Sequence, residues 1–324
     1  MAPARRCCAC RPPRLRLAAG MAAPTRTDWL MMLGVAVLGG SSFAGIELAV
    51  ETAPPAVVAA SRLWIGAAFM AVHTRLSGRP FLPWRPRRAW AYAAAAGLIG
   101  YAAPMTLIPL AQQTVTSILA SVYQAFMPVM TVLLAAAFAD EVLTRRKLTG
   151  FALGTAGVLV LVGPDALRGV LTADVVAQGL LLVAIFGYAA AGVIMRRAPD
   201  VPERGFAAAF LGLGAVAATP GAIIAGTEGI SPASWAAIAY LGIFPTGITA
   251  IFIILVVRRV GAGFLAMSAY AAPVVALILG VAFLKERAGW QELAGLSAIL
   301  AGVAVAQPGA VRAFRAALSS RAGR

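Results

Sequence analysis

The chain has 324 residues, of which 61% are hydrophobic and only 12% are charged, and its mean hydropathy is +0.86. A soluble domain is about half apolar and about a quarter charged, so this composition excludes an ordinary water-soluble protein. The formal net charge is +15, but a chain made almost entirely of apolar runs has no soluble basic face that could bind nucleic acid.

The first predicted element is a tail, residues 1–28, that we expect on the cytoplasmic side. All three cysteines lie in this tail, where a reducing environment gives no disulfide. They do not complete a zinc site, because the only histidine, His73, follows the first predicted span. Met21 is a candidate for the true start, which would make residues 1–20 an over-extended reading frame. A disordered tail, cysteine acylation and a targeting segment are the alternatives.

Ten apolar segments follow, each close to the length of about 20 residues that crosses a bilayer as a helix. Lipid offers no partner to backbone polar groups, and these runs are too continuous for barrel strands, so each span must be an α-helix. The predicted fold class is an all-α integral membrane protein with ten transmembrane helices. The spans are residues 29–48, 55–74, 89–110, 115–138, 148–163, 174–195, 205–226, 234–257, 262–284 and 290–307.

The loops between the spans indicate how the chain crosses the membrane. With the N-terminus inside, most of the 27 Lys and Arg residues fall in loops and tails on the cytoplasmic side, including the basic tail 308–324. The loops on the other side hold only Arg168, Lys285 and Arg287. This bias is the positive-inside rule. It predicts a multi-pass protein of the cell (inner) membrane with both termini cytoplasmic.

The sequence repeats itself at an offset of 145 residues, the separation of Pro128 and Pro273. The segments MPVMTVLLAAAFADE (residues 127–141) and APVVALILGVAFLKE (residues 272–286) both place Pro second, Phe twelfth and Glu last. Because each copy holds five spans, an odd number, the second copy enters from the opposite side, which predicts two inverted five-helix repeats. The same offset pairs Gly34 with Gly179, Trp90 with Trp235, Gly97 with Gly242, Gly150 with Gly295 and Gly157 with Gly302.

Three segments carry a family resemblance. LGGSSFAGIELA (residues 38–49) resembles the first-helix signature of EamA-type members of the drug/metabolite transporter (DMT) superfamily. SRLWIGAAFMA (residues 61–71) is similar to the second helix of that family, with its single Arg. Residues 116–162 are similar to the fourth and fifth helices, in which Pro and a following Glu recur in both halves. The resemblance implies a first EamA repeat at residues 29–163, with helices 1–5, and a second at 174–307, with helices 6–10.

The repeated Pro and Glu residues are candidates for gating or structural roles. Pro128 and Pro273 each remove a backbone hydrogen bond inside a span, which either kinks a helix to fit the bundle or forms a hinge. Glu141 and Glu286 begin short connections, where a carboxylate either binds a helix N-terminus, pairs locally as Glu141 could with Arg145, or serves a gate or a proton. Gly150 and its neighbours on the same helical face are expected to pack two helices closely.

Arg62 is unusual because it lies well inside an apolar span, where an unpaired cation is costly. It should therefore face a cavity or a partner, and Glu47 near the outer end of the first helix is a candidate partner. An ion pair with Glu47 and a contact with an anion or carboxylate of the substrate are the two alternatives. His73, at the cytoplasmic end of the second helix, is expected at the interface, with a proton relay as the alternative.

Further polar and aromatic residues inside the spans could line a cavity for amphipathic solutes, although hydroxyls also bond to their own helix. Several of them lie on helices that the repeat makes equivalent. The candidates for the substrate pathway are Ser41, Ser42, Arg62, Tyr101, Thr106, Tyr123, Gln124, Tyr188, Thr246, Ser268 and Tyr270.

These features predict a secondary transporter that exports small metabolites, such as amino acids or related amphipathic solutes, by alternating access between two inverted repeats. The alternatives are a facilitative, channel-like permease and a membrane-embedded enzyme. The sequence lacks H-E-x-x-H, G-x-x-x-x-G-K-[ST] and a His/Cys cluster, so we expect no enzyme, catalytic residue, metal or cofactor. The expected partners are a small-molecule substrate, the lipid bilayer and either a proton or a counter-solute.

Overall fold

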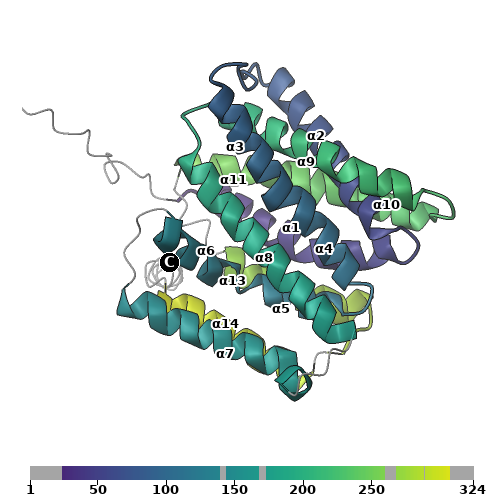
Figure 1. The fold of residues 1–324 in the computed structure, drawn as a ribbon, viewed down its shortest axis with the longest axis vertical. Helices are drawn as coiled ribbons and strands as arrows, with labels where there is room; N and C mark the ends of the chain where they lie inside the picture. The colour runs from purple at the N-terminus through teal and green to yellow at the C-terminus, as the bar shows by residue number, and fades with distance from the viewer. Residues whose placement is uncertain (1–23, 139–143, 168–172, 260–267, 288, 307–324) are drawn as a thin grey trace, which may run out of the picture.

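The computed structural model describes residues 24–138, 144–167, 173–259, 268–287 and 289–306, and the regular elements in these ranges are helices (Figure 1). Glu141 lies outside the described residues. The helices of the first half are α1 (Arg26–Val50), α2 (Pro55–Leu76), α3 (Arg87–Gly97), η1 (Leu98–Ala102), α4 (Ala103–Ala111), α5 (Ser117–Gln124), α6 (Met127–Phe138) and α7 (Arg145–Leu167). Those of the second half are α8 (Ala173–Arg197), α9 (Glu203–Ala225), α10 (Pro232–Leu241), η2 (Gly242–Ile248), α11 (Thr249–Arg259), α13 (Ser268–Phe283) and α14 (Trp290–Ala306).

Several of these helices are long and apolar enough to cross a bilayer. In the described part of the chain there are six: Arg26–Val50, Pro55–Leu76, Arg87–Ala111, Asp174–Met195, Glu203–Ala225 and Pro232–Val256. Two shorter apolar helices cover Ser117–Thr131 and Ala271–Phe283. The protein is therefore an all-helical, multi-pass membrane protein, as predicted, and the count of ten spans stays a prediction.

The third helix of each half contains a π-helical segment where the sequence predicted an uninterrupted α-helix. The two segments, η1 and η2, occupy positions that the offset of 145 makes equivalent. In η2 the physical cause is visible. Pro245 has no N–H to donate to the carbonyl of Leu241, and the hydroxyl of Thr246 donates to that carbonyl instead, at 2.9 Å. Such π-segments often mark functional sites.

The fourth span also differs from the prediction of one helix over residues 115–138. A turn at Ala125 and Phe126 separates α5 from α6. The break lies next to Pro128, which has no N–H to donate to the carbonyl of Gln124 and which stands in the first turn of α6, where Pro is tolerated. Pro273, its equivalent in the second half, lies inside the continuous helix α13.

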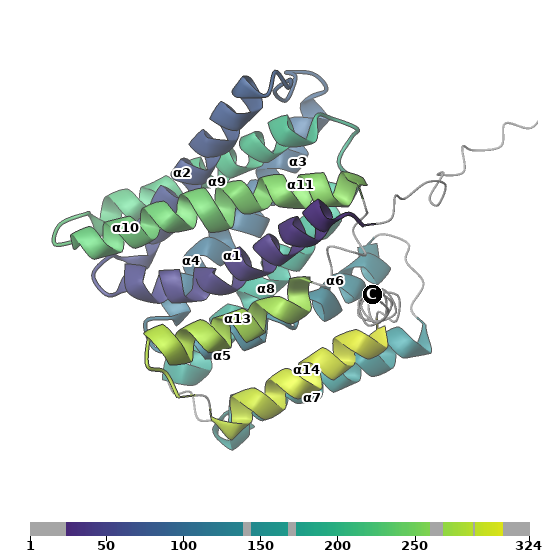
Figure 2. The same cartoon turned by 180° about the vertical axis from the view of Figure 1, so that it is seen from behind.

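The two halves contact each other in equivalent pairs. Helices α7 and α14 lie side by side along one edge of the bundle (Figures 1 and 2). A Cβ atom on Gly157 would lie 2.9 Å from the carbonyl oxygen of Gly295, and one on Gly302 would lie 2.7 Å from the amide nitrogen of Gly154. The predicted close packing at these glycines is confirmed. The offset of 145 exchanges Gly157 with Gly302 and Gly295 with Gly150, and a Cβ atom on Gly302 would lie 2.5 Å from the carbonyl oxygen of Gly150, so the two halves make equivalent contacts here.

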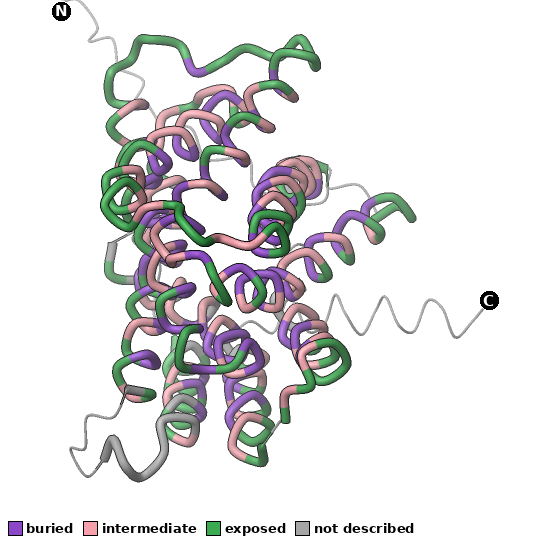
Figure 3. The backbone as a smooth tube through the Cα atoms, turned by 90° about the vertical axis from the view of Figure 1, so that its right-hand side faces the viewer, coloured by how far each residue is buried: buried purple, intermediate pink, exposed green. Residues whose placement is uncertain are grey.

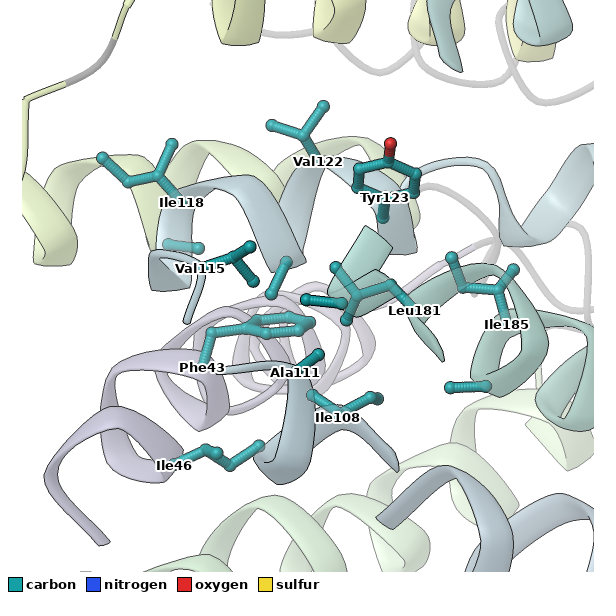
Figure 4. Close-up of a cluster of buried hydrophobic side chains, with 14 of the residues drawn as sticks. Phe43, Ile46, Ile108, Ala111, Val115, Ile118, Val122, Tyr123, Leu181 and Ile185 are labelled. Carbon is teal, nitrogen blue, oxygen red and sulfur yellow. The ribbon is translucent and has the colours of Figure 1, made fainter. Parts of the chain in front are cut away.

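The main hydrophobic core also joins the two halves. Burial follows the inward sides of the helices (Figure 3). Figure 4 shows side chains from both halves meeting in one cluster, with Phe43 and Ile108 facing Leu181 and Ile185. Tyr123 belongs to the same cluster and has no exposed surface. This core fixes the helices that surround the polar residues described next.

Candidate functional site

The centre of the bundle holds a buried arginine. Arg62 on α2 is only 6% exposed. Its Nε donates a hydrogen bond of 2.9 Å to the hydroxyl of Thr246 in η2, so the π-segment of the second half positions an arginine of the first. Thr246 is the equivalent of Tyr101 in η1, which places one polar residue in each π-segment.

The predicted ion pair between Arg62 and Glu47 does not form. No carboxylate in the described part of the chain lies within ion-pair distance of Arg62. Glu47 instead accepts a hydrogen bond of 3.2 Å from Nε2 of Gln112. The same Nε2 also donates to the carbonyl of Phe43 at 3.0 Å. Glu47 lies near the end of α1, whereas Arg62 lies more than one full turn inside α2. The two side chains therefore bond to different helices.

Two tyrosines interact with the arginine, and a third packs against one of them. The phenols of Tyr188 and Tyr240 lie close enough to the Arg62 guanidinium to interact with it electrostatically. The ring of Tyr188 meets the ring of Tyr101 edge-on, with centroids 6.4 Å apart, and Tyr101 stacks on Phe210 at 4.6 Å. The hydroxyls of Tyr240 and Ser41 share a hydrogen bond of 2.6 Å.

We call this group the Arg62 cluster. It draws on α1, α2 and η1 of the first half and on α8, α9, α10 and η2 of the second, so it lies between the halves. The sequence analysis missed two members, although Tyr240 satisfies the criterion that selected the others, a phenol inside an apolar span. The Arg62 cluster consists of Ser41, Arg62, Tyr101, Tyr188, Phe210, Tyr240 and Thr246.

The other predicted pathway residues on the first half bond elsewhere. The hydroxyl of Tyr123 donates to Oε1 of Gln178 at 2.5 Å, and in Figure 4 it points away from Phe43. Nε2 of Gln124 donates to the sulfur of Met127 at 3.4 Å. Thr106 donates to the carbonyl of Ala102 in its own helix at 2.8 Å.

For three further candidates, the structure gives mainly the helix on which each residue lies. Ser42 is buried in α1, beside Ser41. Ser268 is the first residue of α13. Tyr270 lies in the same helix, and its side chain is outside the described part. These residues therefore remain predictions for the pathway.

One end of the bundle, which we call the Glu286 end, is closed by hydrogen bonds between the halves. The carboxylate of Glu286 accepts from the backbone N–H of Ser117 at 2.8 Å and of Ile118 at 3.1 Å. It thereby caps the N-terminus of α5, where a negative charge is favoured. Lys285 adopts a positive φ of 56°, which turns the chain so that the amide of Glu286 reaches the carbonyl of Gly280 at 3.0 Å.

A second set of bonds joins the halves at the Glu286 end. The hydroxyl of Thr52, which follows α1, donates to the hydroxyl of Ser234 at 2.7 Å and accepts from the amide of Ser231 at 3.0 Å. Ser234 in turn donates to the carbonyl of Leu48 at 3.1 Å. These bonds link the end of α1 to the start of α10.

The opposite end, the Asp28 end, has different links. Oδ1 of Asp28 at the start of α1 forms an ion pair of 3.2 Å with Nε of Arg259 at the end of α11. His73, at the end of α2, lies 3.2 Å from Nη1 of Arg204 in α9. Residues 79–80 and 200–204 line an open groove beside this contact. Among the described residues, no group of His, Cys, Asp and Glu side chains is arranged to hold a metal ion.

Comparisons with known proteins agree with this architecture. The sequence profile described as "EamA-like transporter family" matches residues 27–163 and again residues 176–306. A search of curated proteins gives no match. A solved structure titled "Crystal structure of protein" is similar over 88% of this chain and 98% of its own, with a TM-score of 0.64 and 22% sequence identity. This likeness concerns the fold alone.

Proposed function

The chain belongs to the EamA-like transporter family of the drug/metabolite transporter superfamily, and on this premise we propose that it is a secondary transporter of small metabolites. It exports amino acids or related amphipathic solutes by alternating access between its two halves. The two halves are inverted repeats, residues 29–163 and 174–307, that move against each other around the Arg62 cluster. Both termini face the cytoplasm of a bacterial inner membrane.

The observation that carries this proposal is the place of the Arg62 cluster between halves that contact each other in equivalent pairs. A transporter built from inverted repeats binds its solute near the midplane, at the interface of the repeats, and exposes it to each side in turn. Arg62 and Tyr101 come from the first half, and Tyr188 and Thr246 from the second. A movement of one half against the other would therefore reshape the cluster itself.

The bonds between the halves at the two ends support alternating access over a fixed pore. Opening at the Glu286 end requires the carboxylate of Glu286 to leave the N-terminus of α5. Opening at the Asp28 end requires the ion pair of Asp28 and Arg259 to separate. In the proposed cycle these two links are broken in turn, so Glu286 acts as a gate residue as well as a helix cap, and Glu141 has the equivalent role at the opposite end.

Solute counterflow in proteoliposomes tests this function. Purified full-length protein is loaded with unlabelled solute, and uptake of the same labelled solute is followed for a panel of amino acids and related amphipathic compounds. A carrier gives saturable uptake that overshoots equilibrium, because exchange is faster than net flux. Flux without saturation or overshoot would support the alternative of a channel-like permease, and chemical conversion of the solute would support an enzyme.

A further inference from the structure

One side of the buried Arg62 guanidinium has no partner among the described residues. Nε is occupied by Thr246, and the terminal nitrogens Nη1 and Nη2 have no hydrogen-bond or ion-pair partner among the described residues. In the described part of the chain, Nη1 and Nη2 are not among the polar atoms that are both fully buried and without a partner. Since they have no partner, they belong to the 6% of Arg62 that stays exposed. A guanidinium more than nine-tenths buried thus carries two nitrogens whose N–H groups no described residue accepts.

We propose that the Nη1 and Nη2 atoms of Arg62 bind the carboxylate of a solute whose remaining body is apolar or aromatic, a proposal that rests on the transport function above. A planar guanidinium matches a carboxylate with two parallel hydrogen bonds. The bond from Nε to Thr246 fixes the plane of the fork before the solute arrives, which lowers the entropy lost on binding.

The surroundings of Arg62 select the rest of the solute. Tyr188 and Tyr240 interact electrostatically with the guanidinium, and a phenol hydroxyl can donate to a carboxylate oxygen. Beyond Tyr188, the stacked rings of Tyr101 and Phe210 form an aromatic wall. Such a wall favours an apolar or flat group over a strongly hydrated one.

The charge of the cluster favours a monoanion over a phosphate ester. Arg62 is the only cation of the Arg62 cluster, and within the described residues no second Lys or Arg bonds to any of its members. One guanidinium balances one carboxylate, whereas a phosphate dianion would leave a negative charge unpaired in a largely dry site.

Equilibrium binding to the full-length protein in nanodiscs tests this site. The probes are 3-phenylpropionate and 4-methylpentanoate, each compared with its neutral primary amide, and phenyl phosphate. We expect each carboxylate to bind at least about tenfold more tightly than its amide, because charge-assisted bonds are roughly twice as strong as neutral ones. Equal affinity for acid and amide, or tighter binding of phenyl phosphate, would overturn the proposal.

Variants of Arg62 locate the preference. Arg62→Gln should reduce the ratio of acid to amide affinity to about one, and Arg62→Lys should give an intermediate ratio, because it keeps the charge and loses the fork. Arg75→Gln, an exposed arginine on the same helix, is the matched control and should keep the wild-type ratio. If Arg62→Gln does not fold, the Arg62→Lys variant tests the proposal. An unchanged ratio of acid to amide affinity in that variant would contradict a two-bond contact between the guanidinium and the carboxylate.

The same preparations separate this site from the transport function. Counterflow of the carboxylates and amides with equal efficiency would keep the transporter and remove the carboxylate site. Tenfold selective binding that depends on Arg62 but comes with no counterflow of the bound acid would keep the site and remove the transport function.

Discussion

The guanidinium of Arg62 and the hydroxyl of Thr246 are 184 residues apart in the sequence and 2.9 Å apart in space. Thr246 also donates a hydrogen bond to the carbonyl of Leu241, to which the neighbouring Pro245 has no N–H to donate. One hydroxyl therefore bonds both to the backbone of the π-segment and to the arginine that it orients. A single side chain thus couples the local geometry of one half to the polar site of the whole bundle.

Thr246→Val should weaken solute binding without removing the charge of Arg62. The valine keeps the shape of the side chain but leaves the buried Nε of Arg62 without its partner, at a cost of about 1–3 kcal/mol. We expect a lower unfolding temperature and a higher KM for the transported solute. Thr106→Val is the matched control, because Thr106 bonds only to its own helix, and a control that raised KM equally would contradict the anchoring role.

Glu286→Gln should loosen the Glu286 end. The amide loses the charge that accepts two backbone N–H groups of α5, and a bond to a charged group contributes about 1.5–3 kcal/mol. Ser117 has no exposed surface, so Ser117→Cys, in a chain with Cys7, Cys8 and Cys10 changed to Ser, reports opening through its labelling rate. A membrane-impermeant maleimide should label this cysteine about 5 to 30 times faster in the Gln variant, for a shift of about 1–2 kcal/mol.

Glu292→Gln serves as the control for that experiment. Glu292 is an acidic residue in the first turn of α14, so it lies near Glu286 in the sequence without capping α5. Its substitution should leave the labelling rate of the cysteine at position 117 unchanged. Equal labelling rates in wild-type protein and in Glu286→Gln would show that the cap on α5 does not hold this end closed.

Gly157→Ala should destabilise the contact between α7 and α14. The new Cβ would lie 2.8 Å from Cγ1 of Ile299 and 2.9 Å from the carbonyl oxygen of Gly295, and such overpacking costs about 1–3 kcal/mol. Gly212→Ala on α9 meets nothing within 4 Å and gains helix propensity of up to about 1 kcal/mol. The unfolding temperature should therefore fall in the first variant and stay level or rise in the second, and a fall in both would argue against specific packing.

Reporter fusions test the number and direction of the spans. A periplasm-active and a cytoplasm-active reporter placed at residue 28 and at residue 312 should both report the cytoplasm, because an even number of spans returns the chain to the side on which it began. Reporters on opposite sides would refute ten spans. A shared periplasmic location would refute the orientation that the positive loops predict.

The sequence by itself determined the environment, the helices and the duplication. Composition forces helical spans, since lipid leaves no other partner for the backbone. The glycines at 150 and 157, matched at 295 and 302, predicted close packing of two helices, and the structure shows that these two helices are α7 and α14. Pro128 marked the place where the fourth span breaks. These features depend on each residue's own chemistry or on its neighbours within one turn.

Only the tertiary structure decided which polar groups meet. Glu47 and Arg62 looked like partners because both carry charge near the same membrane segment, yet Gln112 bonds to the first and Thr246 to the second. Glu286 caps a helix of the other half. Such pairings depend on the rotation of each helix about its axis and on how closely helices from different halves approach. Both are set by the packing of the whole bundle, and the spacing of residues along one chain does not encode them.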